Sequence, residues 1–574
     1  MSARLQHIVW VSLLALLAIG VCYYSVMTGN HFVDSPHNGF FVKNALDLLE
    51  GRVLFRDSFN SYGFLSTLIH AAGMEIWGWR IVALLNVTLL FVVALGFGVY
   101  YLWSKVMPPW AAFLTAVLYF VYNYRIHLPW PNYYATFFTL CVGVLLMKWV
   151  EAAHRRRLLV AAGLMASLVF LARQTLAPPL VILVSVFLLF VPAANRRFGE
   201  RMADLAIFLV SFLVVIVPFF VYLSLRSAVT DWWIQSFRLV PLWYSPFAQI
   251  GGGVLSQLIS FEAVLFAELP VLTIIALAAS VTICIQLVLG RMSPGDEALS
   301  LLAVISLAML SQVYPNEGLW RRVLALSLGF GWLVYLPYRA FASRRFEELR
   351  PSFMGRSPVP MYVCAAISVL LVPKVGSVYE EARMAFNFES QPELYFQYVS
   401  EPEVFRGMWL PKEQASFYSA IYEEIVAFRS RHPNAPVITT NGDVLPLTFV
   451  RNNEGFSPMF TVYPSISWAN ITRNPAARMT ERQIQLLLGQ GRENHDFESD
   501  TANVLAYPDY WKDYASFVSS NAPLIINAGR PVPHYVQART VVFKGTPEVA
   551  DSQYYFWWSQ FSDKPQTVIW KPES

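Results

Sequence analysis

The residues best suited to chemistry lie between positions 31 and 63, directly after the first apolar segment of the chain. A carboxylate there can act as a general base, and an arginine can bind a phosphate through two parallel hydrogen bonds. Because charge held against a bilayer is costly, a cluster of such groups predicts a functional site. The carboxylates, cations and histidines of this stretch are Asp34, Asp57, Lys43, Arg52, Arg56, His31 and His37.

The composition is typical of a membrane protein. Of 574 residues, 56% are hydrophobic and 14% are charged, and the mean hydropathy is +0.45. Soluble proteins contain about 25% charged residues. The net charge of +4 is small, which argues against a nucleic-acid partner. The cysteines fall in apolar stretches without metal or disulfide spacing, so we interpret them as buried apolar side chains. They are Cys22, Cys141, Cys284 and Cys364.

About eleven apolar segments are candidates for crossing a bilayer, which takes about 18–20 residues of helix. The first has a thin basic flank and no small-residue cleavage site after it, so we expect an uncleaved anchor. The segments lie at 8–27, 81–103, 109–123, 132–150, 158–172, 176–192, 205–224, 264–290, 298–313, 319–337 and 359–373.

The loops between these segments predict an orientation, because cytoplasmic loops are enriched in Lys and Arg. With a cytoplasmic N-terminus, the inner loops hold the clusters Arg155–Arg157 and Arg196–Arg201, and the basic stretch 339–356. This arrangement places the first outer loop, about 28–80, and everything after 374 outside the cytoplasmic membrane.

The sequence therefore predicts two domains, a transmembrane domain over 1–373 and a soluble domain over 374–574. The second has no apolar run long enough to span a bilayer. A helical pattern at 416–432 and strand candidates at 435–440, 522–528 and 539–545 indicate an α/β domain. Within the first outer loop, an apolar stripe that includes Phe41 and Ala45 predicts a short amphipathic helix on the membrane surface, and Gly51 is its predicted C-cap.

The first outer loop resembles that of the GT-C superfamily of membrane glycosyltransferases. The shared features are an acid after the first span, a helix that ends in L-L-x-G, and the motif R-D-x-F-x-x-Y-G. The family commonly has Pro after the last glycine, where this chain has Phe64. The matching residues are Asp34, Leu48, Leu49, Gly51, Arg56, Asp57, Phe59, Tyr62 and Gly63.

The resemblance implies a polytopic helical fold with an extracytoplasmic domain. It also implies transfer of a sugar from a polyprenyl-phosphate donor, as in the mannosyltransferase-like and aminoarabinose-transferase-like enzymes of bacteria. A single displacement at the anomeric carbon needs a carboxylate as base on the acceptor hydroxyl. The family's first-loop acid corresponds to Asp34. Asp57 is the second catalytic candidate, either positioning the acceptor or helping to hold a metal.

The phosphate of such a donor needs cations, and four arginines of the outer loops are candidates. We favour Arg173, in an R-Q-T turn that some relatives share, and Arg321; the others are Arg80 and Arg125. The stretch around Arg321 departs from a related family pattern at Asn316, Gly318 and Trp320 or Arg321. Snorkelling to lipid headgroups is the alternative role of these side chains.

Aromatic side chains can stack on sugars, so an acceptor could be lined by Tyr62, His37, Trp232 and Trp233. An interfacial aromatic belt is the equal alternative for the Trp pair. No histidine pair has the helical i,i+4 spacing of a zinc site, so we assign no metal residues, although a divalent metal stays possible as a cofactor.

We thus expect a multi-pass glycosyltransferase of the bacterial cytoplasmic (inner) membrane. Its partners would be the bilayer, a polyprenyl-phosphate-linked sugar and a cell-envelope glycan, lipid or protein acceptor. Two other classes stay open, a transporter or flippase of lipid-linked sugars and a non-catalytic partner in envelope glycan assembly. A transporter would carry charges or broken helices near the membrane midplane.

Overall fold

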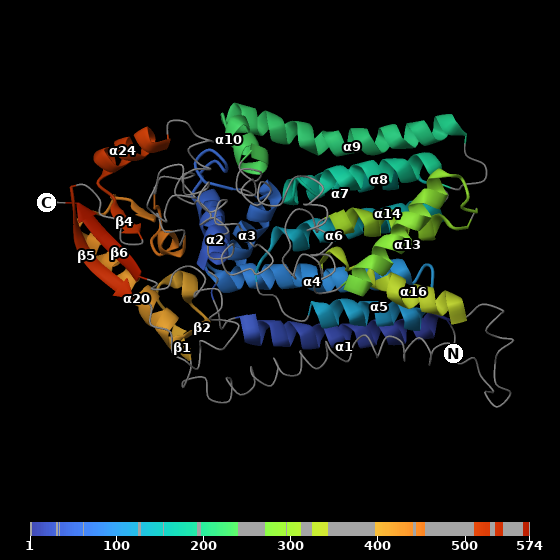
Figure 1. Ribbon diagram of the computed structural model, residues 1–574, viewed down its shortest axis with the longest axis horizontal. Coiled ribbons are helices and arrows are strands. Elements are labelled where there is room, and N and C mark those ends of the chain that lie inside the picture. Colours follow the sequence, from blue (N-terminus) through green and yellow to red (C-terminus); the bar gives the residue numbers. More distant parts are fainter. Residues whose placement is uncertain are drawn as a thin grey trace, which may run out of the picture.

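A layer of long apolar helices and a smaller, partly β-structured region make up the computed structural model of the chain (Figure 1). The N-terminus lies at the end of the helical layer away from the strands, and the C-terminus lies beyond the strands. The structure describes residues 3–29, 33, 35–60, 62–123, 128–152, 154–191, 197–238, 270–293, 295–311, 324–341, 396–439, 444–453, 510–527, 534–542 and 566–572.

The helical layer is built from helices that run back and forth along one direction (Figure 1). Helices α5, α6 and α8 have proline in their first turn. Proline fixes a helical φ there, and the N–H that it lacks would have no partner within the helix. The helices are α1 (Ala3–Gly29), α4 (Ile81–Trp103), α5 (Pro109–Tyr122), α6 (Pro131–Glu151), α7 (Arg156–Ala172), α8 (Ala177–Phe190), α9 (Phe198–Leu225), α13 (Pro270–Val288), α14 (Glu297–Leu310) and α16 (Phe330–Phe341).

Ten of the apolar segments predicted from the sequence coincide with these helices, and the eleventh, 359–373, lies outside the described residues. Among the described residues, four stretches are long and apolar enough to cross a membrane: Leu5–Val26, Ile81–Trp103, Pro131–Glu151 and Phe198–Leu225. Shorter apolar helices accompany them, including Pro109–Tyr122 and Glu297–Leu310. The chain is therefore a multi-pass membrane protein.

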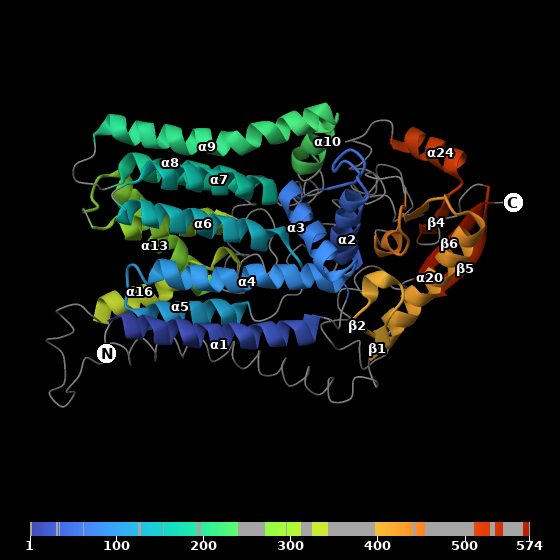
Figure 2. The same cartoon turned by 180° about the vertical axis from the view of Figure 1, so that it is seen from behind.

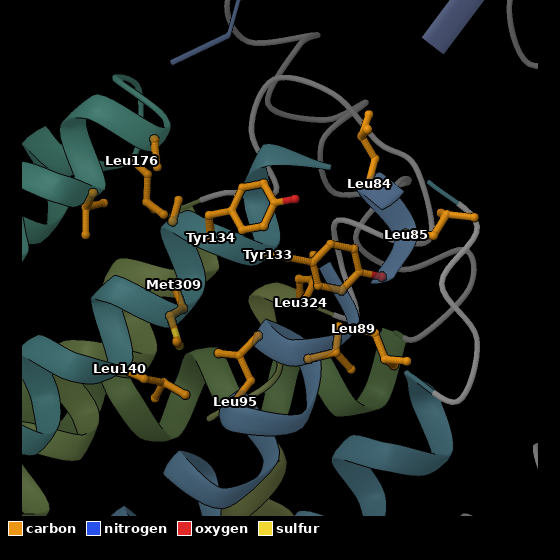
Figure 3. Packing of buried hydrophobic residues seen from close by; sticks show 14 of the residues in the cluster. Leu84, Leu85, Leu89, Leu95, Tyr133, Tyr134, Leu140, Leu176, Met309 and Leu324 are labelled. Carbon is orange, nitrogen blue, oxygen red and sulfur yellow. The ribbon is translucent and has the colours of Figure 1, made fainter. Parts of the chain in front are cut away.

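The core of the layer is apolar, and several of its hydroxyl groups bond to each other or to backbone carbonyls. Leu84, Leu95 and Tyr134 belong to this core (Figure 3). The hydroxyl groups of Thr88 and Tyr134 lie 2.7 Å apart. Glycines allow the closest helix contacts, because a Cβ on Gly163 of α7 would lie 2.4 Å from the Phe208 carbonyl oxygen of α9. Small residues commonly permit such close approach between membrane helices.

Shorter elements gather at the end of the layer that faces the strands (Figure 2). They are α2 (Ser35–Leu49), α3 (Phe64–Trp77), α10 (Val229–Trp233) and the π-helical turn η1 (Ile234–Arg238). At the opposite end, Lys105 pairs with Glu151 at 2.7 Å and Arg156 lies 3.4 Å from Asp204.

The C-terminal region contains a four-stranded sheet in the order β3-β4-β6-β5, with β3 and β4 parallel and the other neighbours antiparallel. A separate antiparallel pair joins β1 and β2. The helix and strands predicted at 416–432, 435–440, 522–528 and 539–545 overlap α20, β3, β4 and β5. The elements are β1 (Phe396–Val399), η3 (Glu403–Phe405), β2 (Met408–Pro411), α20 (Lys412–Arg431), β3 (Val437–Thr439), η4 (Leu445–Thr448), α24 (Tyr510–Asn521), β4 (Leu524–Asn527), β5 (Tyr535–Val542) and β6 (Gln566–Pro572).

Candidate functional site

The first loop lies between the ends of the long helices and the C-terminal region (Figures 1 and 2). Its helix α2 ends as predicted, because Gly51 has a φ of +81° and the Arg52 N–H donates to the Asp47 carbonyl oxygen at 2.9 Å. A residue with positive φ, usually glycine, commonly closes a helix C-terminus in this way.

Helix α2 does not lie on a surface, and this part of the sequence prediction is wrong. Its residues from Asn38 to Asp47 are buried on every face, including Lys43, Asn44 and Asp47. A stripe of apolar side chains predicts one buried face, whereas α2 is covered on one side by membrane helices and on the other by the C-terminal region. Its polar residues are therefore enclosed rather than solvated.

The enclosed polar residues of α2 form one network with the loop that follows. Asp47 is fully buried and forms an ion pair with Lys43, which is 5% exposed. Ser58 donates from its hydroxyl to Asp47 Oδ2 at 2.6 Å and lies 2.8 Å from Asn44 Oδ1, and Arg52 Nε lies 3.5 Å from Asp47. A buried ion pair is tolerated only when its remaining polar atoms are satisfied. The network thus attaches Ser58, the neighbour of Asp57, to α2.

Gln235 of η1 holds the same loop from the other side. Its Nε2 donates to the Phe55 carbonyl oxygen at 2.6 Å, and its Oε1 accepts from the Asn60 N–H at 2.8 Å. Phe55 has a φ of +73°, an uncommon conformation for a residue with a side chain, so these bonds maintain a tight turn. The segment 53–60 is thereby fixed between α2 and η1.

The turn presents Arg56 and Asp57 as a bidentate pair. Arg56 Nε donates to Asp57 Oδ1 at 2.7 Å and Nη2 donates to Oδ2 at 2.9 Å, while the Val53 N–H donates to Oδ2 at 2.9 Å. Burial raises the pKa of Asp57, but the hydrogen bonds from Arg56 and Val53 outweigh it and leave the pKa below its usual value. Asp57 is therefore ionised at neutral pH, and the bonds from Arg56 and Val53 hold it in place.

Asp231, on α10, is a third carboxylate of the site that sequence reasoning missed. Arg56 reaches toward α10, because its Nη1 donates to the Arg226 carbonyl oxygen at 3.1 Å. Burial raises the pKa of Asp231 from 3.8 to about 6; Arg56 opposes this shift and Asp57 adds to it. Its position directly after a predicted span, beside two tryptophans, was the available signal.

Gly63, the last residue of the loop motif, marks a close backbone approach. A Cβ at this position would lie 2.1 Å from the Leu171 carbonyl oxygen, at the end of α7. The next turn is tied to the same place, since the Ser66 hydroxyl donates to the Ala172 carbonyl oxygen at 2.7 Å. The glycine thus lets α3 begin directly against the end of α7, next to Arg173.

Of the four predicted phosphate-binding arginines, the structure describes two. Arg173 caps α7; its Nη1 donates to Asn132 Oδ1 at the start of α6, and its Nε lies 3.3 Å from the Thr175 hydroxyl. Arg80 precedes α4, and its buried Nε has no hydrogen-bond partner among the described residues. Arg125, Arg321 and the predicted base Asp34 lie outside the described residues.

The predicted sugar-lining residues fall into two groups. Tyr62 and His37 both contact Trp130, with ring centroids at 6.0 and 4.7 Å. Trp232 is 7% exposed and packs against Phe220 at 4.9 Å, within a buried apolar cluster, whereas Trp233 is 56% exposed. Of the two tryptophans, therefore, only Trp233 presents a large free surface.

His70, on α3, is buried among aromatic rings. His70 lies among Phe41 and Tyr134, and burial lowers its pKa to about 3, so its imidazole is neutral. No group of three His, Cys, Asp or Glu side chains that could hold a metal ion occurs among the described residues.

No protein-family model matches the sequence, and no curated protein matches it. Solved structures are similar to it at low identity. ArnT from Cupriavidus metallidurans bound to undecaprenyl phosphate is 13% identical, over 98% of both chains, with a TM-score of 0.44. The Archaeoglobus fulgidus oligosaccharyltransferase in complex with Zn and sulfate is 16% identical over 64% of this chain, with a TM-score of 0.41.

The chain spans about half the length of that oligosaccharyltransferase. Because the TM-scores are below 0.5, the function proposed below rests on the residues of this chain.

Removing the charge of Asp47 should destabilise the protein strongly. Asp47→Asn leaves Lys43 as an uncompensated buried charge, which costs about 3–5 kcal/mol. The matched change Glu151→Gln breaks a partly exposed ion pair and should cost less than about 1 kcal/mol. The measurement is thermal unfolding in detergent. The double variant Lys43→Met/Asp47→Asn should recover part of the loss; equal melting temperatures for Asp47→Asn and wild type would contradict the buried pair.

Asp231→Asn should stabilise the protein at neutral pH but not in acid. Folding raises the pKa of Asp231. Its favourable contribution to the free energy of unfolding is therefore complete below pH 3.8 and is lost as the pH rises through about 6. The asparagine variant avoids that loss. Melting temperatures measured from pH 4 to pH 8 should therefore agree near pH 4, separate between about pH 4 and pH 6, and keep a constant difference from pH 6 to pH 8. The same difference at every pH in the measured range would show that Asp231 does not titrate as stated.

Proposed function

We propose that the protein is a glycosyltransferase that takes a sugar from a polyprenyl-phosphate carrier and transfers it to a cell-envelope acceptor. The observation that carries the proposal is the Arg56–Asp57 pair of the R-D-x-F-x-x-Y-G motif, which lies at the ends of apolar helices. Buried bonds to its neighbours Phe55 and Ser58 fix the turn that presents it. A site built at such a boundary can meet a lipid substrate from the bilayer and a polar acceptor from water.

The proposed base is Asp34, which the resemblance assigns. The preceding residue, Val33, is fully buried, and its carbonyl oxygen accepts from Gln414 Nε2 at 2.9 Å. Removing the acceptor proton in the transition state is worth about 10²–10⁴-fold in rate. Asp57, with its low pKa and its bonds to Arg56, suits a positioning role better than proton abstraction.

The donor phosphate would bind among the arginines at the same ends of the helices. Arg173 is proposed as a ligand because it lies between the end of α7 and the start of α6, beside the start of α3. Arg321, Arg80 and Arg125 complete the proposed set. A planar guanidinium binds phosphate in two-pronged fashion. Tyr62, His37 and Trp233 are proposed to line the acceptor.

The proposed orientation has the N-terminus in the cytoplasm and the C-terminal α/β domain, 374–574, outside the inner membrane. Its support is the distribution of cations, since Lys105, Arg156 and Arg201 belong to the end of the helical layer away from the strands. The eleven-span count belongs to the same proposal.

Loss of the Asp34 carboxylate should abolish transfer. In a deletion strain, wild type should restore the missing envelope glycan, whereas Asp34→Asn at the same membrane level should not, because about 10²–10⁴-fold of rate is lost with the base. The control is Glu75→Gln, the same carboxylate-to-amide change on the exposed outer face of α3, which should restore the glycan. Full restoration by Asp34→Asn would contradict the enzymatic proposal and favour a transporter or a non-catalytic partner.

A further inference from the structure

The C-terminal region contacts the first loop just before helix α2, within α2 at Gly39, and just after α2. Before α2, Gln414 Nε2 donates to the Val33 carbonyl oxygen at 2.9 Å, and Gln414 is 1% exposed. After α2, the Asn452 N–H donates to Glu50 Oε1 at 2.7 Å. These contacts join residues about 400 positions apart in the sequence, so they form only in the assembled chain.

At Gly39, the backbone of α2 lies directly against the backbone of η4. A Cβ on Gly39 of α2 would lie 2.6 Å from the Leu445 nitrogen of η4. Close by in sequence, the Arg451 guanidinium stacks on the ring of Trp79, 3.4 Å from its centroid. A cation over an aromatic face is favourable, and Trp79 belongs to the turn between α3 and α4. The C-terminal region therefore contacts both α2 and the base of the membrane helices.

Helix α2 connects these contacts to the R-D-x-F-x-x-Y-G motif. Asp47 and Asn44, on the enclosed part of α2, hold the Ser58 hydroxyl at 2.6 and 2.8 Å. Ser58 adjoins Asp57, so a displacement of α2 would move the Arg56–Asp57 pair. A continuous chain of bonds thus runs from Gln414 and Asn452 through α2 to this pair.

We infer that the C-terminal domain positions the loop that carries the Arg56–Asp57 pair. It does so by holding α2 in place, an arrangement called the clamp below. The two positioning residues are Gln414, in the C-terminal domain, and Glu50, directly after α2. The C-terminal domain is then an integral part of the site rather than an independent acceptor-binding module. This inference rests on the proposed function for its effect on transfer, but the clamp itself does not depend on any substrate.

Hydrogen exchange on the full-length protein in detergent tests the clamp without substrate. Gln414→Leu removes one bond to a buried carbonyl, so peptides covering 33–49 should exchange about tenfold faster. The control Gln397→Leu changes an exposed glutamine of the same region and should leave these peptides unchanged. Faster exchange confined to β3 and β4 would show local damage to the C-terminal domain and would overturn the inference, as would unchanged exchange throughout.

If Gln414→Leu folds poorly, a second pair of variants tests the contact at the other end of α2. Glu50→Ala removes the acceptor for the Asn452 N–H and should speed exchange across α2, whereas Glu50→Gln keeps an oxygen acceptor and should behave as wild type. Equal exchange in the two Glu50 variants would overturn the clamp.

Transfer activity then links the clamp to function. In the deletion strain, Gln414→Leu should lower the restored glycan tenfold to a hundredfold, since small misplacements of catalytic groups carry losses of about that size. Faster exchange with wild-type glycan would overturn the positioning role. Failure of the transferase proposal is distinguishable, because Asp34→Asn would then restore the glycan while the exchange results stand.

Discussion

The buried ion pair of Lys43 and Asp47 is the constraint on which the rest of the site depends. Two charges removed from water are stable only with close partners and satisfied remaining atoms. Here Asp47 also accepts from Ser58, so the requirement extends from α2 into the motif loop. The membrane helices on one side of α2 and the C-terminal region on the other must both be in place to exclude water from the pair. The fold and the site geometry are thus linked by one electrostatic requirement.

Asp57 of this loop and Asp231 of α10 are two carboxylates in opposite environments. Asp57 accepts two guanidinium bonds and a backbone N–H, which keep it ionised, whereas burial raises the pKa of Asp231 to about 6. Neighbouring acids with separated pKa values often divide roles in catalysis. Arg56 connects the two, because it binds Asp57 and also reaches the Arg226 carbonyl next to α10.

The apolar segments predicted within the described residues overlap helices, because a long apolar run favours a helix whose surface is buried or faces lipid. The sequence also located Gly51 as a helix end, since a residue with positive φ leaves a local signal. It failed for α2, whose cover comes from residues some 400 positions later. Periodicity within α2 cannot indicate that Lys43 and Asp47 lose their water. Trp232 was also missed as a core residue, because its neighbours Phe219 and Phe220 lie on a different helix, at the end of α9.

The most direct test of the account is chemical. The purified full-length protein would be placed in liposomes with radiolabelled polyprenyl-phosphate-linked sugars extracted from envelope membranes, together with the total envelope glycolipid fraction as acceptor. The account predicts that the label leaves the carrier lipid and that free polyprenyl phosphate appears in equal amount. Label that stays on the carrier, even if the lipid moves between leaflets, would contradict a transferase.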